Sequence, residues 1–154
     1  MFVVFAVVAA GCSPSIDLTA ALRLDAVTTG WLDAGGVNGM TKLVPAVSLT
    51  VKNVSTQPLR TVQINAVFRR AGDPSEWGSG YLAAAREGGL PPGAATSPLL
   101  LQSEAGYTGT EPREVMLRNS QFVDARVDVY AKTGAQQWTR IGEYDVNRAL
   151  IEAR

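Results

Sequence analysis

Histidine is absent from this chain of 154 residues, and cysteine occurs only once, at Cys12. Without histidine, the chain can form neither a Ser-His-Asp triad nor a Cys-His pair, and it offers zinc no histidine ligand. A single cysteine also excludes a disulfide bond within the chain. The commonest nucleophilic mechanisms of hydrolases are therefore excluded, and the lone thiol needs an explanation of its own.

Charge of either sign is not in excess, because 14 basic and 14 acidic residues give a net charge of zero. The sequence shows no basic stripe of the kind that binds nucleic acid. The aspartates are too scattered for a calcium-binding loop, since Asp17, Asp25, Asp33 and Asp73 lie in or near different turns. We therefore expect no nucleic-acid partner, no metal and no cofactor.

Apolar runs long enough to span a membrane are lacking too. Residues 1–10 form an apolar stretch, but a transmembrane helix needs about 20 such residues. The length suits the apolar core of a secretory signal, which ends in small residues at its cleavage point. The residues Ala9, Ala10, Gly11 and Cys12 resemble the lipobox of bacterial lipoproteins.

This resemblance implies that a signal peptidase cuts before Cys12 and that the cysteine is acylated through a thioether. The predicted organisation is a signal peptide (1–11), a lipidated tether (12–20) and a single domain (21–154). The acyl chains would hold the protein in the bacterial cell envelope. Because Ser13 and not Asp follows the cysteine, the resemblance favours the periplasmic face of the outer membrane in a diderm bacterium.

Two points leave this interpretation of the N-terminus open. Signal peptides begin with basic residues, yet no Lys or Arg precedes Cys12, so we expect the true start to lie upstream of Met1. The alternative is that residues 1–12 are a buried N-terminal strand that ends in Gly11 and Cys12.

Alternation of apolar and polar residues, which is typical of half-buried strands, dominates the rest of the chain. Seven segments carry strand features and are separated by turn residues: 22–26, 45–52, 62–68, 75–82, 98–102, 123–131 and 138–146. The Gly-rich residues 28–43 are predicted to connect the first two strands. Short helical turns are predicted at 114–119 and 147–154. Seven short strands in one domain favour an antiparallel, immunoglobulin-like β-sandwich.

Two neighbouring strands carry a further resemblance. Residues 47–53 end in Asn53 and lead through a polar turn into residues 62–68. This arrangement is similar to FxLYD-like and related small sandwich domains of bacterial envelope proteins, although the FxLYD string itself does not occur. The resemblance supports the fold and implies no specific activity.

Aromatic residues at predicted strand ends and in loops form the candidate binding surface. They are Trp31, Trp77, Tyr81, Tyr107 and Trp138. Trp and Tyr anchor many protein interfaces, and exposed rings can stack on sugars. One Trp in such a sandwich usually belongs to the core, so we expect only part of this set to be exposed.

Three charged residues alternate along the strand at 123–131. Asp124, Arg126 and Asp128 are predicted to project from one face, with successive residues about 7 Å apart. Two carboxylates near this spacing could act on a glycoside. However, an arginine between them would keep both ionised, which leaves no general acid. The pattern favours a charged outer face of the sheet.

The sequence thus predicts a non-catalytic envelope lipoprotein that has a structural or accessory role and binds a protein partner. A glycan-binding module that uses exposed Trp and Tyr residues is the alternative. An enzyme that depends on Asp124 and Asp128 is a third, weaker hypothesis.

Overall fold

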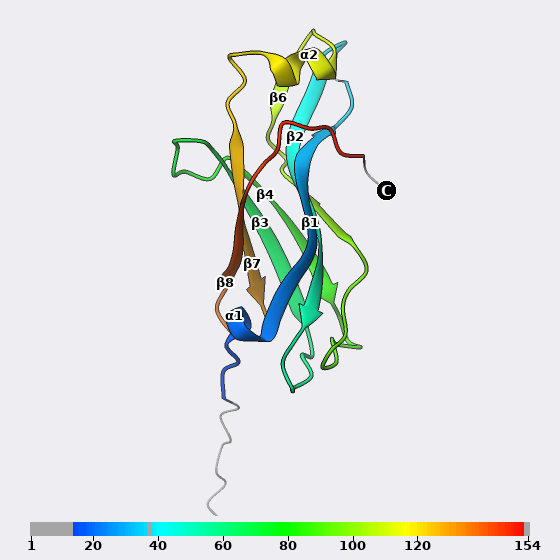
Figure 1. The fold of residues 1–154 in the computed structure, drawn as a ribbon, viewed down its shortest axis with the longest axis vertical. Coiled ribbons are helices and arrows are strands. Elements are labelled where there is room, and N and C mark those ends of the chain that lie inside the picture. The colour runs from blue at the N-terminus through cyan, green and yellow to red at the C-terminus, as the bar shows by residue number, and fades with distance from the viewer. Residues whose placement is uncertain (1–13, 37, 153–154) are drawn as a thin grey trace, which may run out of the picture.

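The computed structural model describes residues 14–36 and 38–152, so the predicted lipobox at 9–12 lies outside the described residues. Two four-stranded sheets pack face to face and form a β-sandwich (Figure 1). The elements in chain order are α1 (Leu18–Ala21), β1 (Leu22–Asp33), β2 (Thr41–Asn53), β3 (Val62–Arg70), β4 (Gly78–Ala85), β5 (Leu99–Gln102), β6 (Tyr107–Gly109), α2 (Arg113–Arg118), β7 (Ala125–Lys132) and β8 (Thr139–Asp145). All strand pairs between these elements are antiparallel. The predicted all-β sandwich is confirmed.

The first sheet is organised around the long strand β2, which pairs with β1 along one side. On the other side, residues 41–43 of β2 pair with β6, and residues 46–49 pair with β5. The second sheet has the order β4-β3-β7-β8, so β3 and β7 are its central strands. The outer face of this second sheet carries the candidate site.

The core lies between the two sheets and follows the alternation seen in the sequence. The inward residues of β3 and β7 are fully buried: Val62, Ile64, Ala66, Phe68, Val127, Val129 and Ala131. The residues between them, such as Gln63 and Asn65, are only partly buried and point to the outer face. A strict two-residue period places one face of each strand in the core.

The two sheets also meet along their edges. At one edge, the Thr29 hydroxyl on β1 donates a hydrogen bond of 2.8 Å to the Asp145 carbonyl at the end of β8. At the other edge, Gly80 of β4 lies so close to β5 that a Cβ atom would stand 2.5 Å from the Gln102 carbonyl oxygen. Only glycine permits this approach. Both sides of the core are therefore closed to water.

Ordered structure begins before the predicted domain start at residue 21. Asp17 caps α1 by accepting a 3.0 Å hydrogen bond from the Thr19 amide, and Leu18 is buried in the core. Ile16 packs against the same core. The tether predicted for residues 12–20 is therefore wrong in its second half, because Ile16 and Leu18 bury apolar side chains there.

The second helix, α2, matches the helical turn predicted at 114–119. Its Met116 and Leu117 are buried against the core. Among the described residues, no helix has the length and apolar character that crossing a membrane requires.

Residues 28–43 were predicted to be a connection, and this prediction is wrong over most of its length. β1 continues to Asp33, and β2 already begins at Thr41. A β-bulge between Asp25 and Thr28, where Ala26 has a φ of 50°, lets the strand continue in a shifted register. The connection is thus reduced to the short turn between the two strands.

The helix predicted at 147–154 is also wrong for the described residues, because the segment up to 152 bends at 148–149 and pairs with β1 instead. The Trp31 amide donates to the Ala149 carbonyl, and the Ile151 amide donates to the Trp31 carbonyl. Ile151 packs on a small apolar cluster that includes Leu32 and Val44 on the outer face of the first sheet. Burial of that cluster holds the C-terminal segment against β1.

Candidate functional site

The five aromatic residues of the predicted surface fall into two groups. Trp31 is fully buried, while Trp77 and Tyr107 are half-buried. The Trp31 ring centroid lies 6.2 Å from that of Trp77, 5.7 Å from that of Tyr107 and 4.6 Å from that of Phe122. These four rings form an internal aromatic cluster. Trp31 is therefore a core residue, and the prediction that it contributes to a binding surface is wrong.

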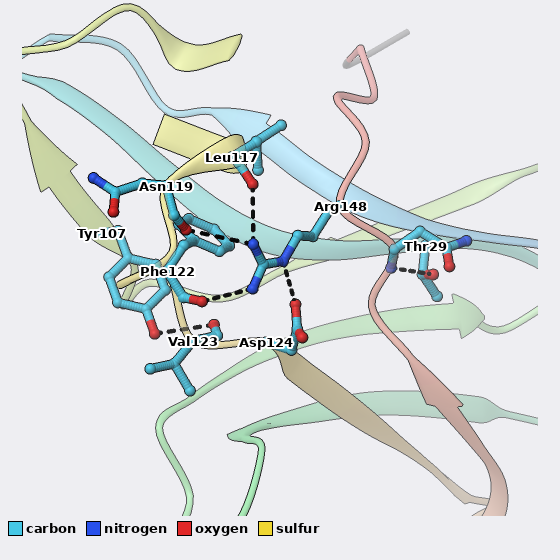
Figure 2. Close-up of polar contacts among 9 residues, drawn as sticks. Thr29, Tyr107, Leu117, Asn119, Phe122, Val123, Asp124 and Arg148 are labelled. Atoms are coloured by element: carbon cyan, nitrogen blue, oxygen red, sulfur yellow. Dashed lines mark hydrogen bonds and ion pairs between the residues drawn. The ribbon is translucent and has the colours of Figure 1, made fainter. Parts of the chain in front are cut away.

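Tyr107 is fixed in this cluster by its hydroxyl as well as by its ring. The hydroxyl donates a 3.1 Å hydrogen bond to the Val123 carbonyl (Figure 2). Burial raises the pKa of the Tyr107 phenol above its ordinary value. The phenol therefore stays neutral and donates to the carbonyl near neutral pH.

Hydrogen bonds from Arg148 hold the C-terminal segment against the same cluster, and we call this set of contacts the clasp. The Arg148 guanidinium donates to the Asp124 carboxylate at 2.6 Å and to the Phe122 carbonyl at 2.7 Å (Figure 2). It also reaches the Leu117 and Asn119 carbonyls at 3.3 and 3.4 Å, and it lies over the Phe122 ring. Every partner of this arginine lies at the end of α2 or in the segment that joins α2 to β7. The clasp is thus structural, and Asp124 belongs to it.

The other two aromatic residues, Tyr81 and Trp138, are exposed on the outer face of the second sheet. Their side chains are 59% and 39% exposed, and their rings meet edge to face with centroids 6.3 Å apart. Tyr81 lies in β4, and Trp138 immediately precedes β8. Two strands that are not neighbours in the sheet therefore present one exposed aromatic pair.

Strand register places a row of polar residues beside this pair. Tyr81 of β4 is opposite Asn65 of β3, Asn65 is opposite Tyr130 of β7, and Tyr130 is opposite Arg140 of β8. The row crosses the whole sheet. It combines ring faces with amide and guanidinium donors, the groups that bind either protein or carbohydrate.

The next row contains a buried carboxylate. Asp128 lies on the outer face, as predicted, but neighbouring side chains leave it only 2% exposed. Arg69 Nε lies 3.6 Å from one carboxylate oxygen, and Arg140 Nη1 lies 3.7 Å from the other. The two long arginine side chains cover the carboxylate and exclude water from it.

The ion pair of Asp128 and Arg69 leaves hydrogen-bonding capacity unused. Asp128 Oδ1 and Arg69 Nη1 are buried and have no hydrogen-bond partner. A buried polar atom without a partner costs free energy, so such atoms are rare. Both atoms are covered by neighbouring side chains, so a ligand would reach them only after the arginine side chains moved.

The three charged residues predicted to share one face, Asp124, Arg126 and Asp128, therefore have three different surroundings. Asp124 belongs to the clasp, Asp128 is buried under arginines, and half-buried Arg126 pairs with Glu143 at 3.5 Å. Sequence reasoning missed Arg69. The sequence could have placed Arg69 on the outer face, because the two-residue alternation of β3 puts it on the same face as Asn65.

Neither the acidic residues nor the hollow on the first sheet forms a recognisable catalytic group in the described part of the chain. Within it, no group of three or more acidic, histidine or cysteine side chains could hold a metal ion. A surface hollow of about 720 Å³ lies on the first sheet, lined by Ser48, Thr50, Pro98 and Ile151 among others. Glu152 is its single titratable residue, so it lacks a pair of groups for acid–base chemistry.

Comparison with known proteins gives no family for this chain. No family model matches it, and no curated protein is similar to it. Three solved structures are similar to it at low TM-scores. A Northeast Structural Genomics Consortium target has 13% identity and a TM-score of 0.46, and the match covers 84% of this chain and 89% of that one. A Bordetella pertussis protein titled "Putative ApaA Protein" has 14% identity and a TM-score of 0.42 (81% and 91% covered), and an Archaeoglobus fulgidus protein has 14% identity and a TM-score of 0.39 (80% and 92% covered). At these low TM-scores, the similarities carry no argument about function.

Proposed function

We propose that the chain is a non-catalytic lipoprotein of the bacterial cell envelope, anchored through acylated Cys12, and that it binds a protein partner through the outer face of the β4-β3-β7-β8 sheet. The lipobox-like residues 9–12 support the anchor. The folded domain begins by Ile16, so an anchor and a folded module fit together in one short chain. An outer-membrane location follows from Ser13 by the same resemblance.

The exposed pair of Tyr81 and Trp138 carries the proposal for the binding face. Aromatic residues and arginine are enriched at the centres of protein interfaces, where a few of them supply most of the binding free energy. Arg140 lies in the same row as Tyr81, and its side chain is half exposed. A partner that covers this face would therefore contact both rings and the guanidinium.

A glycan-binding module is the second candidate, and the same aromatic pair favours it. Sugar rings stack on Trp and Tyr, and their hydroxyl groups both donate and accept hydrogen bonds. The partly exposed Asn65 amide and Arg140 guanidinium of the same row offer hydrogen-bond donors to those hydroxyl groups. The two candidates share a surface and differ in the partner.

The anchor is tested by the intact mass of the protein extracted from membranes. We expect the wild type to have the mass of residues 12–154 plus acyl chains. Cys12→Ala should lose the acyl mass and leave the membrane fraction, because the thioether needs the thiol. An unmodified wild-type mass that includes Met1 would refute the lipoprotein proposal.

The binding face is tested by mild crosslinking of the tagged protein in intact cells of its own organism. We expect a crosslinked protein partner that Tyr81→Ala and Trp138→Ala each weaken at least tenfold, the loss typical of one hot-spot residue. Met40→Ala is the control, since Met40 is 38% exposed at a different surface. Equal capture by all variants would show that the face is not the interface.

The glycan candidate predicts a different result, which tryptophan fluorescence of the wild type and of Trp138→Ala can show. If the partner is a polysaccharide, envelope glycan fragments should shift the fluorescence of wild-type protein, and Trp138→Ala should abolish this shift. Trp31 remains as an internal reference, because it is buried away from any ligand.

A further inference from the structure

One end of the sandwich gathers α1 and three loops, and we name it the α1 end (Figure 1). Its parts are residues 14–21 and the loops 53–61, 86–98 and 133–138. The Val54 amide donates to the Ala21 carbonyl, and the Gln136 side chain donates to the Ile16 carbonyl at 3.2 Å. The Asn53 side chain donates to the Leu90 carbonyl. Hydrogen bonds thus join all three loops into one surface.

The distance between this surface and the predicted anchor is short. Ile16 is already held by the core and by Gln136, so only residues 13–15 separate it from Cys12. Four residue steps of fully extended chain span at most about 14 Å. If Cys12 carries acyl chains that are inserted in a bilayer, the α1 end must stay within this distance of the lipid surface.

The charge of the two ends agrees with such an orientation. The segments of the α1 end contain two acidic and two basic residues. The connections at the opposite end, residues 33–41, 70–77 and 103–124, contain seven acidic and three basic residues. An anionic lipid surface repels acidic residues within about a Debye length. The opposite end is therefore the one that such a surface disfavours.

Exposed apolar side chains at the α1 end suit the membrane interface. Val54 is 43% exposed in the loop next to α1, and Trp138 is 39% exposed at the end of the loop that binds Ile16. Trp is enriched at the level of lipid headgroups. These residues would lose exposed apolar surface on contact with the bilayer.

We infer that the α1 end rests against the lipid surface, with Val54 and Trp138 at the level of the headgroups. This inference rests on the proposed acylation of Cys12. The long axis of the sandwich then points away from the membrane, and α2 lies at the far end (Figure 1). Trp138 then lies where the binding face meets the headgroups, so a protein partner must itself reach the membrane surface.

The orientation is tested by a fluorescent probe at each end of the lipidated protein. Because Cys12 is the only cysteine and its thiol is consumed by the lipid, Val54→Cys and Val115→Cys each supply a unique thiol. The two valines are a matched pair, 43% and 39% exposed, at the α1 end and on α2. Each variant is labelled with an environment-sensitive dye and reconstituted in vesicles of phosphatidylethanolamine and phosphatidylglycerol that contain nitroxide-labelled lipid.

We expect quenching at position 54 to exceed that at position 115 at least threefold. Equal quenching at both positions, or stronger quenching at 115, would overturn the inference. The intact mass of the same samples separates the two proposals. Acylated protein with equal quenching overturns the orientation alone, whereas absence of acyl chains overturns the anchor and, with it, the orientation.

Discussion

Trp31→Ala should lower the free energy of unfolding by about 3–5 kcal/mol, the usual cost of removing a large buried aromatic side chain. Trp31 is fully buried and contacts the rings of Trp77, Tyr107 and Phe122. Its loss leaves a cavity and removes three ring contacts. This is a large part of the stability of a typical domain. Urea unfolding followed by circular dichroism measures the change.

Two variants control for this effect. Trp31→Phe keeps an aromatic ring and removes the indole N–H, which is buried without a hydrogen-bond partner, so it should cost less than half as much as the alanine variant. Trp138→Ala removes the same side chain from a site that is 39% exposed and should cost about 1 kcal/mol or less. Similar losses in Trp31→Ala and Trp138→Ala would contradict the division of the tryptophans between core and surface.

Strands with one buried face and one solvent-exposed face were the easiest to predict from the sequence. In β3 and β7 every second residue is buried in the core, and the outward residues are buried only at Val67 and Asp128, so both strands could be placed from their pattern alone. β2 breaks this pattern, because residues 43–47 are all buried. The C-terminal segment covers the outer side of the first sheet there, through Ile151. A strand covered on both faces shows no alternation, which explains why its start was missed.

The candidate site was predictable only in part. The residue types were found, but a strand residue's face depends on register, and register follows from pairing between distant segments. Tyr81 and Trp138 lie 57 positions apart in the sequence, and their rings meet at 6.3 Å although β4 and β8 are the two edge strands of the sheet. The burial of Asp128 depends likewise on Arg69, from another strand. Alternation within a single segment cannot show either contact.

Arg148→Met should lower the free energy of unfolding by about 2 kcal/mol, since hydrogen bonds to a charged group contribute about 1.5–3 kcal/mol and this guanidinium is partly exposed. The variant keeps a long apolar stem but removes the guanidinium donor from the carbonyls of Leu117, Asn119 and Phe122. The segment between α2 and β7 should loosen, and its amides should exchange hydrogen faster. Hydrogen exchange measured by mass spectrometry checks this local effect.

The ion pair with Asp124 is the smaller part of the clasp. Asp124 is 55% exposed, and exposed ion pairs contribute only about 0.2–1 kcal/mol, so Asp124→Asn should cost less than half as much as Arg148→Met. Arg148→Lys keeps the charge, but its single ammonium cannot reproduce the planar fork that serves three carbonyls and a carboxylate. We therefore expect it to resemble Arg148→Met more than the wild type. If Arg148→Lys were as stable as the wild type, charge alone would account for the clasp, and the carbonyl contacts would contribute little.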